Sequence, residues 1–537
     1  MSQHVLIRTA RVCLINCDMA TPRERFVEAL NFLKDLQDRG IVGIHTSDMP
    51  NRKYRELLVK NGFIREVIKG WYVASNPEEK VGETTAWYSS YWDFIVLFLE
   101  RKYGDNWCLA ADQSLLLHAG NRSVPQQLLI RSSDGNNKQT PLPHNTSLFN
   151  MRTELPPADP LIITDNGIRM YNLQASLIYA SPSIYIRNAI DARTALSLIR
   201  DASEVLPILL ENGHTTLAGR LAGAFRNIGR DRIADQIVDT FKQADYDIRE
   251  EDPFQTRLEL KLPARERSPY ANRIRLMWLQ MREVVIANFP AAPGIQPDHN
   301  AFMKDVDDIY VTDAYHSLSI ERYRVTPELI EKVSSGKWDT EDSEEDRRQG
   351  DAMAARGYYQ AFRSVKDSVK AILEGANAGL QVGNDHSKWY RELFDPSVAS
   401  GLLRASDLSG YRNNQVYITN SKHVPLNVDA MRDAMSVLFE MLEEESEASV
   451  RAVLGHFVFV FIHPYMDGNG RMGRFLLNVM LASGGYPWTV VPVEKRDEYM
   501  QALEKASVEQ DVAPFAAFIG YLVSQALQGK AVAELPK

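Results

Sequence analysis

The sequence has few cysteines and no long hydrophobic run, and both shortages narrow the kind of protein it can be. Three cysteines occur among 537 residues, Cys13, Cys17 and Cys108, and their spacing matches neither a disulfide framework nor a four-ligand zinc site. No apolar stretch reaches the roughly 18 to 20 residues that span a bilayer, and polar residues interrupt the apolar ones at the N-terminus. The sequence therefore predicts a reduced, cytoplasmic protein with no signal peptide and no membrane segment.

An excess of positive charge is also missing. The chain has 61 Lys and Arg against 70 Asp and Glu, a net charge of -9. This balance argues against nonspecific binding of nucleic acid by the whole surface, although a single domain can still be basic. Hydrophobic residues at 45% and charged residues at 24% are typical of a globular protein, and the length predicts about three or four domains.

Residues 1–77 have the pattern of a winged helix-turn-helix. The stretch "RFVEALNFLKDLQD" at 25–38 has apolar residues at helical spacing, and "NRKYRELLVKNG" at 51–62 predicts a second helix with a cap and a glycine stop. The following "FIREVIKGWYVA" at 63–74 consists of two β-favouring runs broken by Lys-Gly, which predicts a hairpin. Helices followed by a hairpin favour this fold.

This first segment is basic within an acidic chain. Residues 1–76 carry 12 Lys and Arg against 8 Asp and Glu, a net charge of +4. Arg52, Lys53 and Arg55 lie in the second predicted helix and are residue types that contact phosphates and guanine edges. We therefore predict that they bind DNA. Solvated charges on an exposed helix face are the alternative interpretation.

Residues 80–245 mix helical and strand patterns and predict a small α/β domain. From about residue 20 to 230 the chain resembles the AbiEi family of bacterial antitoxins, through the wing-like "GFIREVIKGWY" at 62–72 and the helical "SLLLHAG" at 114–120. The resemblance implies sequence-specific DNA binding with repression or antitoxin-like control, and no catalysis in this part. His118 has no second ligand at metal spacing, so we expect a packed structural role for it.

The remainder of the chain is predicted to be mainly helical, with a helical region at 265–350 and a core at 351–530. One β-rich piece, "QVYITNSKHVPL", interrupts the helices and predicts a short hairpin or flap that includes Val416, Tyr417, Ile418 and Thr419. The expected fold class is multidomain and mainly α. An all-α domain with a β-hairpin flap follows a winged helix-turn-helix and a small α/β domain.

A glycine-rich turn follows an almost wholly apolar helix in "IHPYMDGNGRMGR". Gly468, Asn469 and Gly470 permit a tight turn into the next helix, which would aim several backbone N–H groups outward at the positive end of the helix dipole. Arg471 and Arg474 lie three residues apart on one face of that helix, where guanidinium groups can hold further oxyanions. The pattern predicts a site for a di- or triphosphate.

Two more residues of this stretch carry chemistry. Asp467 can supply the carboxylate oxygen that Mg²⁺ prefers, and His463 can take a proton from a hydroxyl near neutral pH. The alternative is a plain helix–helix turn in which His463 caps the first helix and the arginines face water. The number of matching positions at fixed offsets favours the chemical interpretation.

These offsets resemble the core motif of the Fic family, His-x-Phe-x-Asp/Glu-Gly-Asn-Gly-Arg-x-x-Arg, with Tyr465 in the Phe position. The similarity runs from about residue 268 to 523. It implies a helical fold with a flap, and transfer of AMP from ATP, with Mg²⁺, to a Tyr, Thr or Ser hydroxyl of a protein target or of the chain itself. The intact Gly-Asn-Gly argues against the kinase-like branch of the family.

The resemblance also implies a role for each matching position. His463 would be the general base and Asp467 the Mg²⁺ ligand, and the flap would align the target segment by β-augmentation. Tyr499 would line the adenine pocket, although a buried aromatic residue is an equally good interpretation. The phosphates would be held by Gly468, Asn469 and Gly470 (α and β), Arg471 (β) and Arg474 (γ).

The stretch "HSLSIERYRVTPEL" resembles the inhibitory helix of many Fic proteins, Ser/Thr-x-x-x-Glu-Gly/Asn, at Ser317 and Glu321. The implied contact pairs Glu321 with Arg474, and a guanidinium held in this way is unavailable to the γ-phosphate. Arg322 replaces the small residue of the pattern, which predicts looser packing of the helix and weaker or differently triggered regulation. An ordinary surface glutamate, or one that positions water for AMP removal, remains an alternative.

A function of another class is compatible with the same sequence. The chain could be a DNA-binding repressor or antitoxin-like regulator whose Fic domain serves as a nucleotide sensor or removes AMP. A second copy of the chain, in a homodimer, is a further candidate partner under either function.

Overall fold

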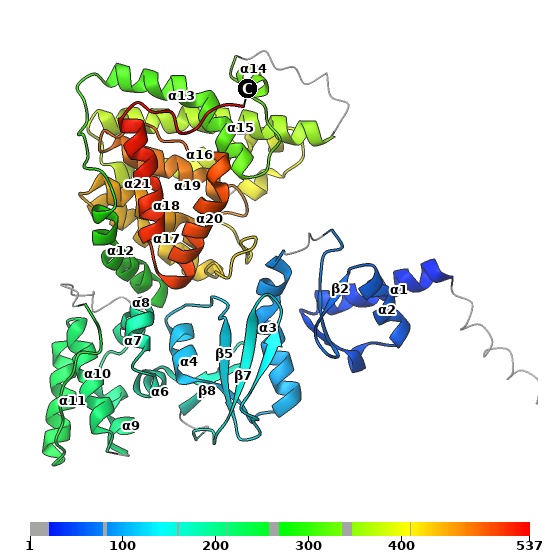
Figure 1. The fold of residues 1–537 in the computed structure, drawn as a ribbon, viewed down its shortest axis with the longest axis vertical. Helices are drawn as coiled ribbons and strands as arrows, with labels where there is room; N and C mark the ends of the chain where they lie inside the picture. The colour runs from blue at the N-terminus through cyan, green and yellow to red at the C-terminus, as the bar shows by residue number, and fades with distance from the viewer. Residues whose placement is uncertain are drawn as a thin grey trace, which may run out of the picture. The chain divides into compact units, whose positions relative to one another are not determined.

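The structure is a computed structural model that describes residues 21–78, 83–157, 161–211, 213–256, 268–335, 346–408 and 410–536. The chain forms two compact units, shown as a ribbon in Figure 1. The first unit comprises residues up to Ala110, Val124–Met170 and Thr419–Ser421, and the second comprises the remainder. Cys13 and Cys17 lie outside the described residues. Cys108 is a buried free thiol, and burial raises its pKa to about 11.

The first unit begins with two helices and a three-stranded antiparallel sheet in the order β1-β3-β2. Asn51 caps the second helix, because its side-chain oxygen accepts a hydrogen bond from the N–H of Tyr54 at 3.0 Å. Both predicted helices and the predicted hairpin are present. The elements are α1 (Pro22–Asp38), β1 (Gly43–His45), a short 3₁₀ helix (Thr46–Asp48), α2 (Arg52–Lys60), β2 (Ile64–Ile68) and β3 (Trp71–Ala74).

A long helix and a mixed four-stranded sheet complete the first unit. The sheet has the order β4-β5-β7-β6, in which β5 and β7 are parallel and the other pairs are antiparallel. A two-stranded hairpin follows, turning at Asn166 and Gly167, which both have positive φ as Asn-Gly turns favour. The elements are α3 (Thr85–Tyr103), β4 (Cys108–Leu109), β5 (Gln127–Ser132), β6 (Lys138–Leu142), β7 (Thr146–Arg152), β8 (Ile162–Asp165) and β9 (Ile168–Tyr171).

The second unit is helical. Its helices are α4 (Ala111–His118), α6 (Leu173–Tyr179), α7 (Ile184–Arg187), α8 (Ala189–Ser197), α9 (Leu206–Glu211), α10 (Thr215–Asn227), α11 (Asp231–Gln243), α12 (Pro269–Ala287), α13 (His299–Ile320), α14 (Pro327–Ser334), α15 (Asp346–Leu373), α16 (Ala378–Ala399), α17 (Val428–Glu444), α18 (Ala448–Ile462), α19 (Asn469–Ala482), α20 (Arg496–Glu504) and α21 (Ala513–Leu527). Among the described residues, no helix is both long and apolar enough to cross a bilayer.

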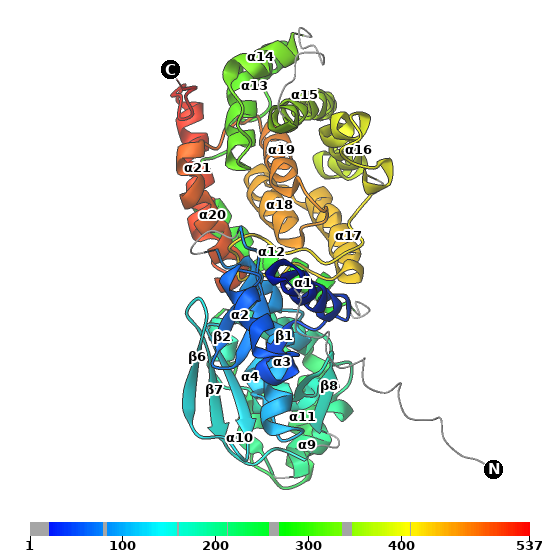
Figure 2. The ribbon, with the colours of Figure 1, turned by 90° about the vertical axis from the view of Figure 1, so that its right-hand side faces the viewer.

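Helix α18 lies at the centre of this unit and positions the glycine-rich turn. Almost every residue of α18 is buried, and the helix packs against α12, α17, α19 and α21. Figure 2 shows α17 and α19 next to it. An apolar helix that is buried all round has no free face on which to slide or rotate. The turn that follows it is therefore held on a rigid element.

The two compact units do not follow the four predicted segments, because the segment predicted at 80–245 is divided between them. Helices α6–α11 belong with the C-terminal helices. Buried polar contacts explain this: Arg193 on α8 donates to the side-chain oxygen of Gln280 on α12 at 3.0 Å, and Asp191 on α8 forms an ion pair with Arg273 on α12. Both partners of the ion pair are buried.

The predicted β-hairpin flap is not a hairpin. Residues 410–427, including Val416–Thr419, contain neither helix nor strand. Side chains take the backbone carbonyls that a strand partner would otherwise occupy. Arg412 donates to the carbonyls of Asn414 and Leu426, and Gln415 donates to the carbonyl of Pro425 at 2.7 Å. We call residues 410–426 the flap segment.

Candidate active site

His463 ends helix α18 in a conformation that frees one ring nitrogen. It is the C-cap residue in the left-handed region (φ 55°), and its ring Nδ1 lies 3.2 Å from the carbonyl oxygen of Val460. A carbonyl can only accept, so Nδ1 carries the hydrogen and Nε2 keeps its lone pair. Burial lowers the pKa of His463 to about 4. The imidazole is therefore neutral near pH 7 and can accept a proton at Nε2.

The next five residues form a closed turn. The side chain of Asn469 accepts from the N–H of Tyr465 at 2.9 Å and donates to its carbonyl at 2.8 Å. The ring of Tyr465 stacks on Tyr390, with centroids 3.7 Å apart and planes 8° from parallel. Gly468 has φ +79°, and a Cβ there would lie 2.9 Å from the ring of Phe394. The side chain of Asn469 thus shapes the turn, whereas the backbone N–H of Asn469 stays available to bind an anion.

The first turn of α19 offers N–H groups to an anion. The first intrahelical bond runs from Met472 N to the carbonyl of Gly468 at 2.9 Å, so the N–H groups before Met472 precede the helical ladder. A Cβ at Gly470 would collide with Oε1 of Glu321. A carboxylate oxygen therefore already lies against the turn that was predicted to hold phosphate.

Arg471 is buried beside this turn, next to two aromatic rings and the carboxylate of Asp467. Arg471 is 1% exposed, and its guanidinium lies 5.1 Å from the ring centroid of Tyr323 and 5.0 Å from that of Phe394. Its Nη2 is 3.3 Å from Oδ2 of Asp467, whose side chain is 67% exposed. Among the described residues, Nε of Arg471 has no hydrogen-bond partner.

Arg474 and the inhibitory-type helix meet as the sequence predicts. Nε of Arg474 donates to the hydroxyl of Ser317 at 2.9 Å, and Nη2 donates to the Ser317 carbonyl at 2.9 Å and to Oε1 of Glu321 at 2.8 Å. Burial by itself would raise the pKa of Glu321, but the charges of Arg474 and Arg471 outweigh it and lower that pKa. The carboxylate is therefore ionised at neutral pH.

Arg322 matters for the backbone at the end of α13, and its side chain does not pack against the helix's neighbours. It follows the C-cap Glu321 with φ 69°, while its N–H donates to the carbonyl of Ser319 at 2.9 Å and the N–H of Tyr323 donates to that of Leu318 at 3.1 Å. These two bonds define a Schellman motif, whose left-handed residue is usually Gly or Asn. The looser packing expected from a bulky side chain is wrong, because this residue is exposed and the contact of Glu321 with Arg474 is made.

Tyr499 is buried in the core. It is 1% exposed, its hydroxyl lies 2.8 Å from Nε2 of His456, and its ring packs near Phe515 and Phe518. Burial raises its pKa to about 12. Of the two interpretations of Tyr499, these contacts favour a buried aromatic residue over a residue that lines the adenine pocket.

A single carboxylate fits a Mg²⁺ ion that is bound largely by nucleotide and water. Among the described residues no group of three His, Cys, Asp or Glu could hold a metal. Asp467 accepts the N–H of Gly468 at 2.6 Å and remains largely exposed. Mg²⁺ commonly takes one or two carboxylates with phosphate oxygens and waters, so the donor set fits.

Several residues around this site carried no signal of their own in the sequence. Tyr390, Phe394 and Tyr323 surround the turn and Arg471, but each is an aromatic residue in a helical or irregular stretch with an ordinary core pattern. His423 of the flap segment lies 2.8 Å from the carbonyl of Phe461 through Nε2. In the sequence, the only sign of this residue was a histidine within the β-rich piece.

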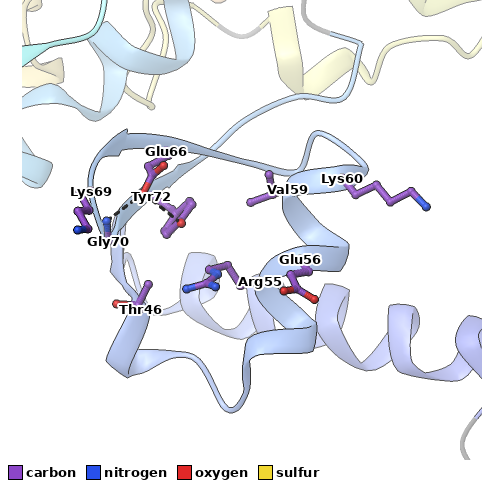
Figure 3. A pocket seen from close by; sticks show the side chains of 9 residues that line it. All are labelled: Thr46, Arg55, Glu56, Val59, Lys60, Glu66, Lys69, Gly70 and Tyr72. Atoms are coloured by element: carbon purple, nitrogen blue, oxygen red, sulfur yellow. Dashed lines mark hydrogen bonds between the residues drawn. The ribbon is translucent and has the colours of Figure 1, made fainter.

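The residues predicted to bind DNA lie on α2, in the first unit. Arg52 and Lys53 are exposed, and Arg52 forms an ion pair with Glu56 at 2.6 Å. Arg55 lines a groove of about 620 Å³ between α2 and the β2–β3 hairpin, shown in Figure 3. The groove is lined by Thr46, Arg55, Glu56, Val59, Lys60, Glu66, Lys69, Gly70 and Tyr72.

Comparison with known proteins locates a domain in the C-terminal half. Residues 385–481 match the model of the Fic/DOC family. Protein adenylyltransferase Fic of Drosophila willistoni is 37% identical over 113 residues, which is 20% of this chain and 22% of that protein. The Drosophila virilis protein of the same name is also 37% identical over 113 residues, or 23% of its length. The chain thus matches less than a quarter of the length of these relatives.

Solved structures give a weaker likeness. Fic-1 (aa134–508) from C. elegans is 18% identical, with a TM-score of 0.36 over 64% of this chain and 97% of that one. A Fic domain-containing signalling protein from Bacteroides thetaiotaomicron is 16% identical, with a TM-score of 0.34 over 48% of this chain and 100% of that one. At these scores the structural likeness supports no argument.

The family model covers none of residues 1–384, so the winged helix-turn-helix and the resemblance to AbiEi stay predictions. The glycine-rich turn, His463 and both arginines lie inside the matched range. The chain therefore contains a Fic/DOC domain, and it is related in this part to protein adenylyltransferase Fic.

Proposed function

We propose that this protein transfers AMP from ATP to a hydroxyl side chain of a protein target or of itself. The observation that carries the proposal is the carboxylate of Glu321, which lies against Gly470 and is bound by Arg474. A site that already holds one oxyanion at the N-terminus of a helix is suited to the phosphates of a nucleotide. The neutral Nε2 of His463 supplies the base that such a reaction needs.

In the proposed reaction the hydroxyl oxygen of the target attacks the α-phosphorus of ATP, and its proton passes to Nε2 of His463. A bond forms between that oxygen and the α-phosphorus, and the bond from the α-phosphorus to the oxygen bridging to the β-phosphate breaks. Pyrophosphate leaves and AMP stays on the target. Catalysis then rests on positioning and charge, because His463 and the first turn of α19 are held on rigid elements.

The phosphates would be held at Gly468, Asn469 and Gly470, with the N–H groups of Asn469 and Gly470 as donors, because the N–H of Gly468 is bound by Asp467. Arg471 would contact the β-phosphate and Arg474 the γ-phosphate. Asp467 would hold Mg²⁺, which when bound neutralises charge on the phosphates. Arg471 supports this assignment, since it is buried and its Nε has no partner among the described residues. A phosphate oxygen nearby would give this Nε–H an acceptor.

Glu321 is proposed to inhibit the reaction. Ser317 and Glu321 occupy the Nε and Nη2 donors of Arg474. The guanidinium cannot offer these groups to the γ-phosphate, so ATP would settle in an unproductive position. The same carboxylate could instead orient water for removal of AMP from a modified target. The flap segment, through Val416, Tyr417, Ile418 and Thr419, would align the target backbone beside His463.

The test uses full-length protein, Mg²⁺ and ATP labelled at either the α- or the γ-phosphate. With ATP labelled at the α-phosphate, the Glu321→Gly protein should become labelled itself or should label proteins of an added lysate. With ATP labelled at the γ-phosphate, no protein should become labelled. His463→Ala in that background should remove the signal, whereas the control His299→Ala, at the first turn of α13, should keep it. Label from the γ-phosphate, or none from either position, would overturn the proposal.

A second proposed activity is DNA binding by the first unit. The groove between α2 and the hairpin is lined by three cations, Arg55, Lys60 and Lys69, together with the carboxylates of Glu56 and Glu66, within a net-acidic chain. Cations on a helix and an adjacent hairpin suit the phosphate backbone of a duplex. In this case the chain would act as a repressor or antitoxin-like regulator, and its Fic/DOC domain as a nucleotide sensor or an AMP-removing enzyme.

Anisotropy of the full-length protein with duplexes from its own promoter region tests this activity. Binding should weaken steeply as salt rises, and the double variant Lys53→Ala/Arg55→Ala should bind less well at every salt concentration. Arg39→Ala is the control, because Arg39 is an exposed cation at the end of α1 that is not among the residues lining the groove. Absence of binding at all salt concentrations would refute the DNA-binding proposal.

A further inference from the structure

Arg412 joins the flap segment to the backbone at His463. Its Nε donates to the carbonyl of His463 at 2.8 Å, and its own N–H donates to the carbonyl of Pro464 at 2.9 Å. Nη1 donates to the carbonyl of Asn414 at 2.8 Å, and Nη2 donates to that of Leu426. One side chain therefore binds the beginning and the end of the flap segment, at Asn414 and Leu426, and also the residue proposed as the general base.

This arginine is unusual because the partners of its guanidinium are backbone carbonyls. It is 2% exposed, and each nitrogen of its guanidinium donates to a carbonyl of the flap segment or of His463. Burial lowers its pKa to about 10. Burying a cation against neutral partners costs free energy, which a merely space-filling apolar residue would avoid.

The backbone of His463 needs such support. A residue with a Cβ in the left-handed region is strained and persists only where its surroundings hold it. Two bonds from Arg412 act on His463 and Pro464, and His423 of the flap segment adds a third through Nε2 at the carbonyl of Phe461, 2.8 Å away. The ring of His423 also stacks on that of Phe461, with centroids 4.2 Å apart.

We infer that Arg412 is a positioning residue, which fixes the left-handed backbone of His463 to the flap segment and so sets the distance between a flap-bound hydroxyl and Nε2. The inference rests on the proposed transfer of AMP. The hydrogen bonds of Arg412 end at carbonyls of the flap segment and of the turn after α18, namely those of Asn414, Leu426, His463 and Pro464. Among the described residues none of them reaches Arg471 or Arg474. Loss of Arg412 should therefore affect transfer and leave nucleotide binding intact.

The experiment compares Arg412→Gln with Arg451→Gln, both in the full-length Glu321→Gly protein. Arg451 is a matched control on the opposite end of α18, since it also donates to backbone carbonyls, those of Glu445 and Ser446. The measurements are kcat for AMP transfer, Kd for ATP with Mg²⁺, and amide hydrogen exchange over residues 410–426 and 459–466. Arg412→Lys, which keeps the buried charge but loses the planar fork, replaces Arg412→Gln if that protein does not fold.

For Arg412→Gln we expect kcat to fall about 100-fold and Kd for ATP to change less than about 3-fold, because a misplacement near 1 Å costs about that factor in rate. Exchange should rise in both segments, while Arg451→Gln leaves all three measurements unchanged. A general loss of structure would raise Kd together with the loss of kcat, and this result overturns the inference. Unchanged kcat and exchange also overturn it.

Failure of the proposed AMP transfer can be distinguished from failure of the inference about Arg412. If the Glu321→Gly protein transfers no AMP, the hydrogen exchange decides alone. Faster exchange of both segments in Arg412→Gln, but not in Arg451→Gln, supports the link between the flap segment and His463. Equal protection in the two variants refutes it.

Discussion

Replacing Glu321 by Gln removes the carboxylate charge beside Arg474 and keeps the shape of the side chain. In the structure Oε1 of Glu321 accepts from Nη2 of Arg474 at 2.8 Å, and the two side chains are 34% and 5% exposed. Arg474 keeps its two bonds to Ser317 in the variant. The substitution therefore isolates the charge of the carboxylate.

The expected size of the effect follows from this geometry. Two unit charges 2.8 Å apart attract by about 6 kcal/mol at an effective dielectric constant of about 20. Screening at the exposed third of Glu321 and the cost of desolvation remove most of this, since exposed pairs contribute at most about 1 kcal/mol and breaking a buried pair costs about 3 to 5 kcal/mol. An intermediate net value of about 2 kcal/mol corresponds to about 30-fold in an equilibrium.

We predict that the Glu321→Gln protein is less stable but more active. Without nucleotide, Glu321→Gln should lower the free energy of unfolding in urea by about 2 kcal/mol. With ATP and Mg²⁺, kcat/KM for AMP transfer should rise about 30-fold, because Arg474 becomes available to the γ-phosphate. Glu328→Gln, which changes an exposed carboxylate in the first turn of α14, is the control. A kcat/KM within about 3-fold of the wild-type value would refute the competition for Arg474.

Three further predictions follow from the same region. Arg322→Gly should raise stability in urea by about 0.5 to 1 kcal/mol, because the left-handed backbone at this position favours glycine; a loss of stability would contradict the assignment. Gly470→Ala should cost about 1 to 3 kcal/mol and much less in a Glu321→Gly background, as a double-mutant cycle can measure; equal costs would mean that the carboxylate does not lie against Gly470. Burial lowers the folded-state pKa of His423 to about 3 and of His463 to about 4, below the unfolded value near 6.5. The unfolded chain then binds more protons between these values, so stability should be level above about pH 7 and fall as the pH drops from about 6.5 towards 4, less so in His423→Gln; urea unfolding independent of pH in this window would contradict the burial of these rings.

Local patterns predicted the elements of the site and some of its contacts. The cap at Asn51, the turn at Gly468 and the contact of Glu321 with Arg474 all depend on spacing along one or two helices, and all three are present. Fixed offsets work here because a helix converts spacing directly into position. The chemical roles of these residues remain proposals.

Features that depend on distant partners were beyond local patterns. The flap segment has β-favouring residues, but a strand requires a partner, and Arg412 and Gln415 bind the carbonyls that a partner would use. Tyr499 has the spacing of either a pocket or a core residue, and only its contact with His456 decides. Side chains from distant segments set both outcomes.

Arg322 illustrates a different difficulty. Its mismatch with the small residue of the inhibitory pattern suggested a packing defect, whereas the position requires a left-handed backbone after the end of α13. The distinction depends on the residue at which the helix stops, and sequence locates helix ends poorly. The ion pair of Asp191 with Arg273, which joins α8 to α12, carried no local signal either.

The intact mass of the Glu321→Gly protein after incubation with ATP and Mg²⁺ tests the central claim most directly. We predict a gain of one AMP on the protein itself or on a protein of an added lysate, and no gain when His463→Ala is also present. Masses that stay unchanged in both the Glu321→Gly protein and the lysate would contradict the account, and so would a gain of one phosphate in place of AMP.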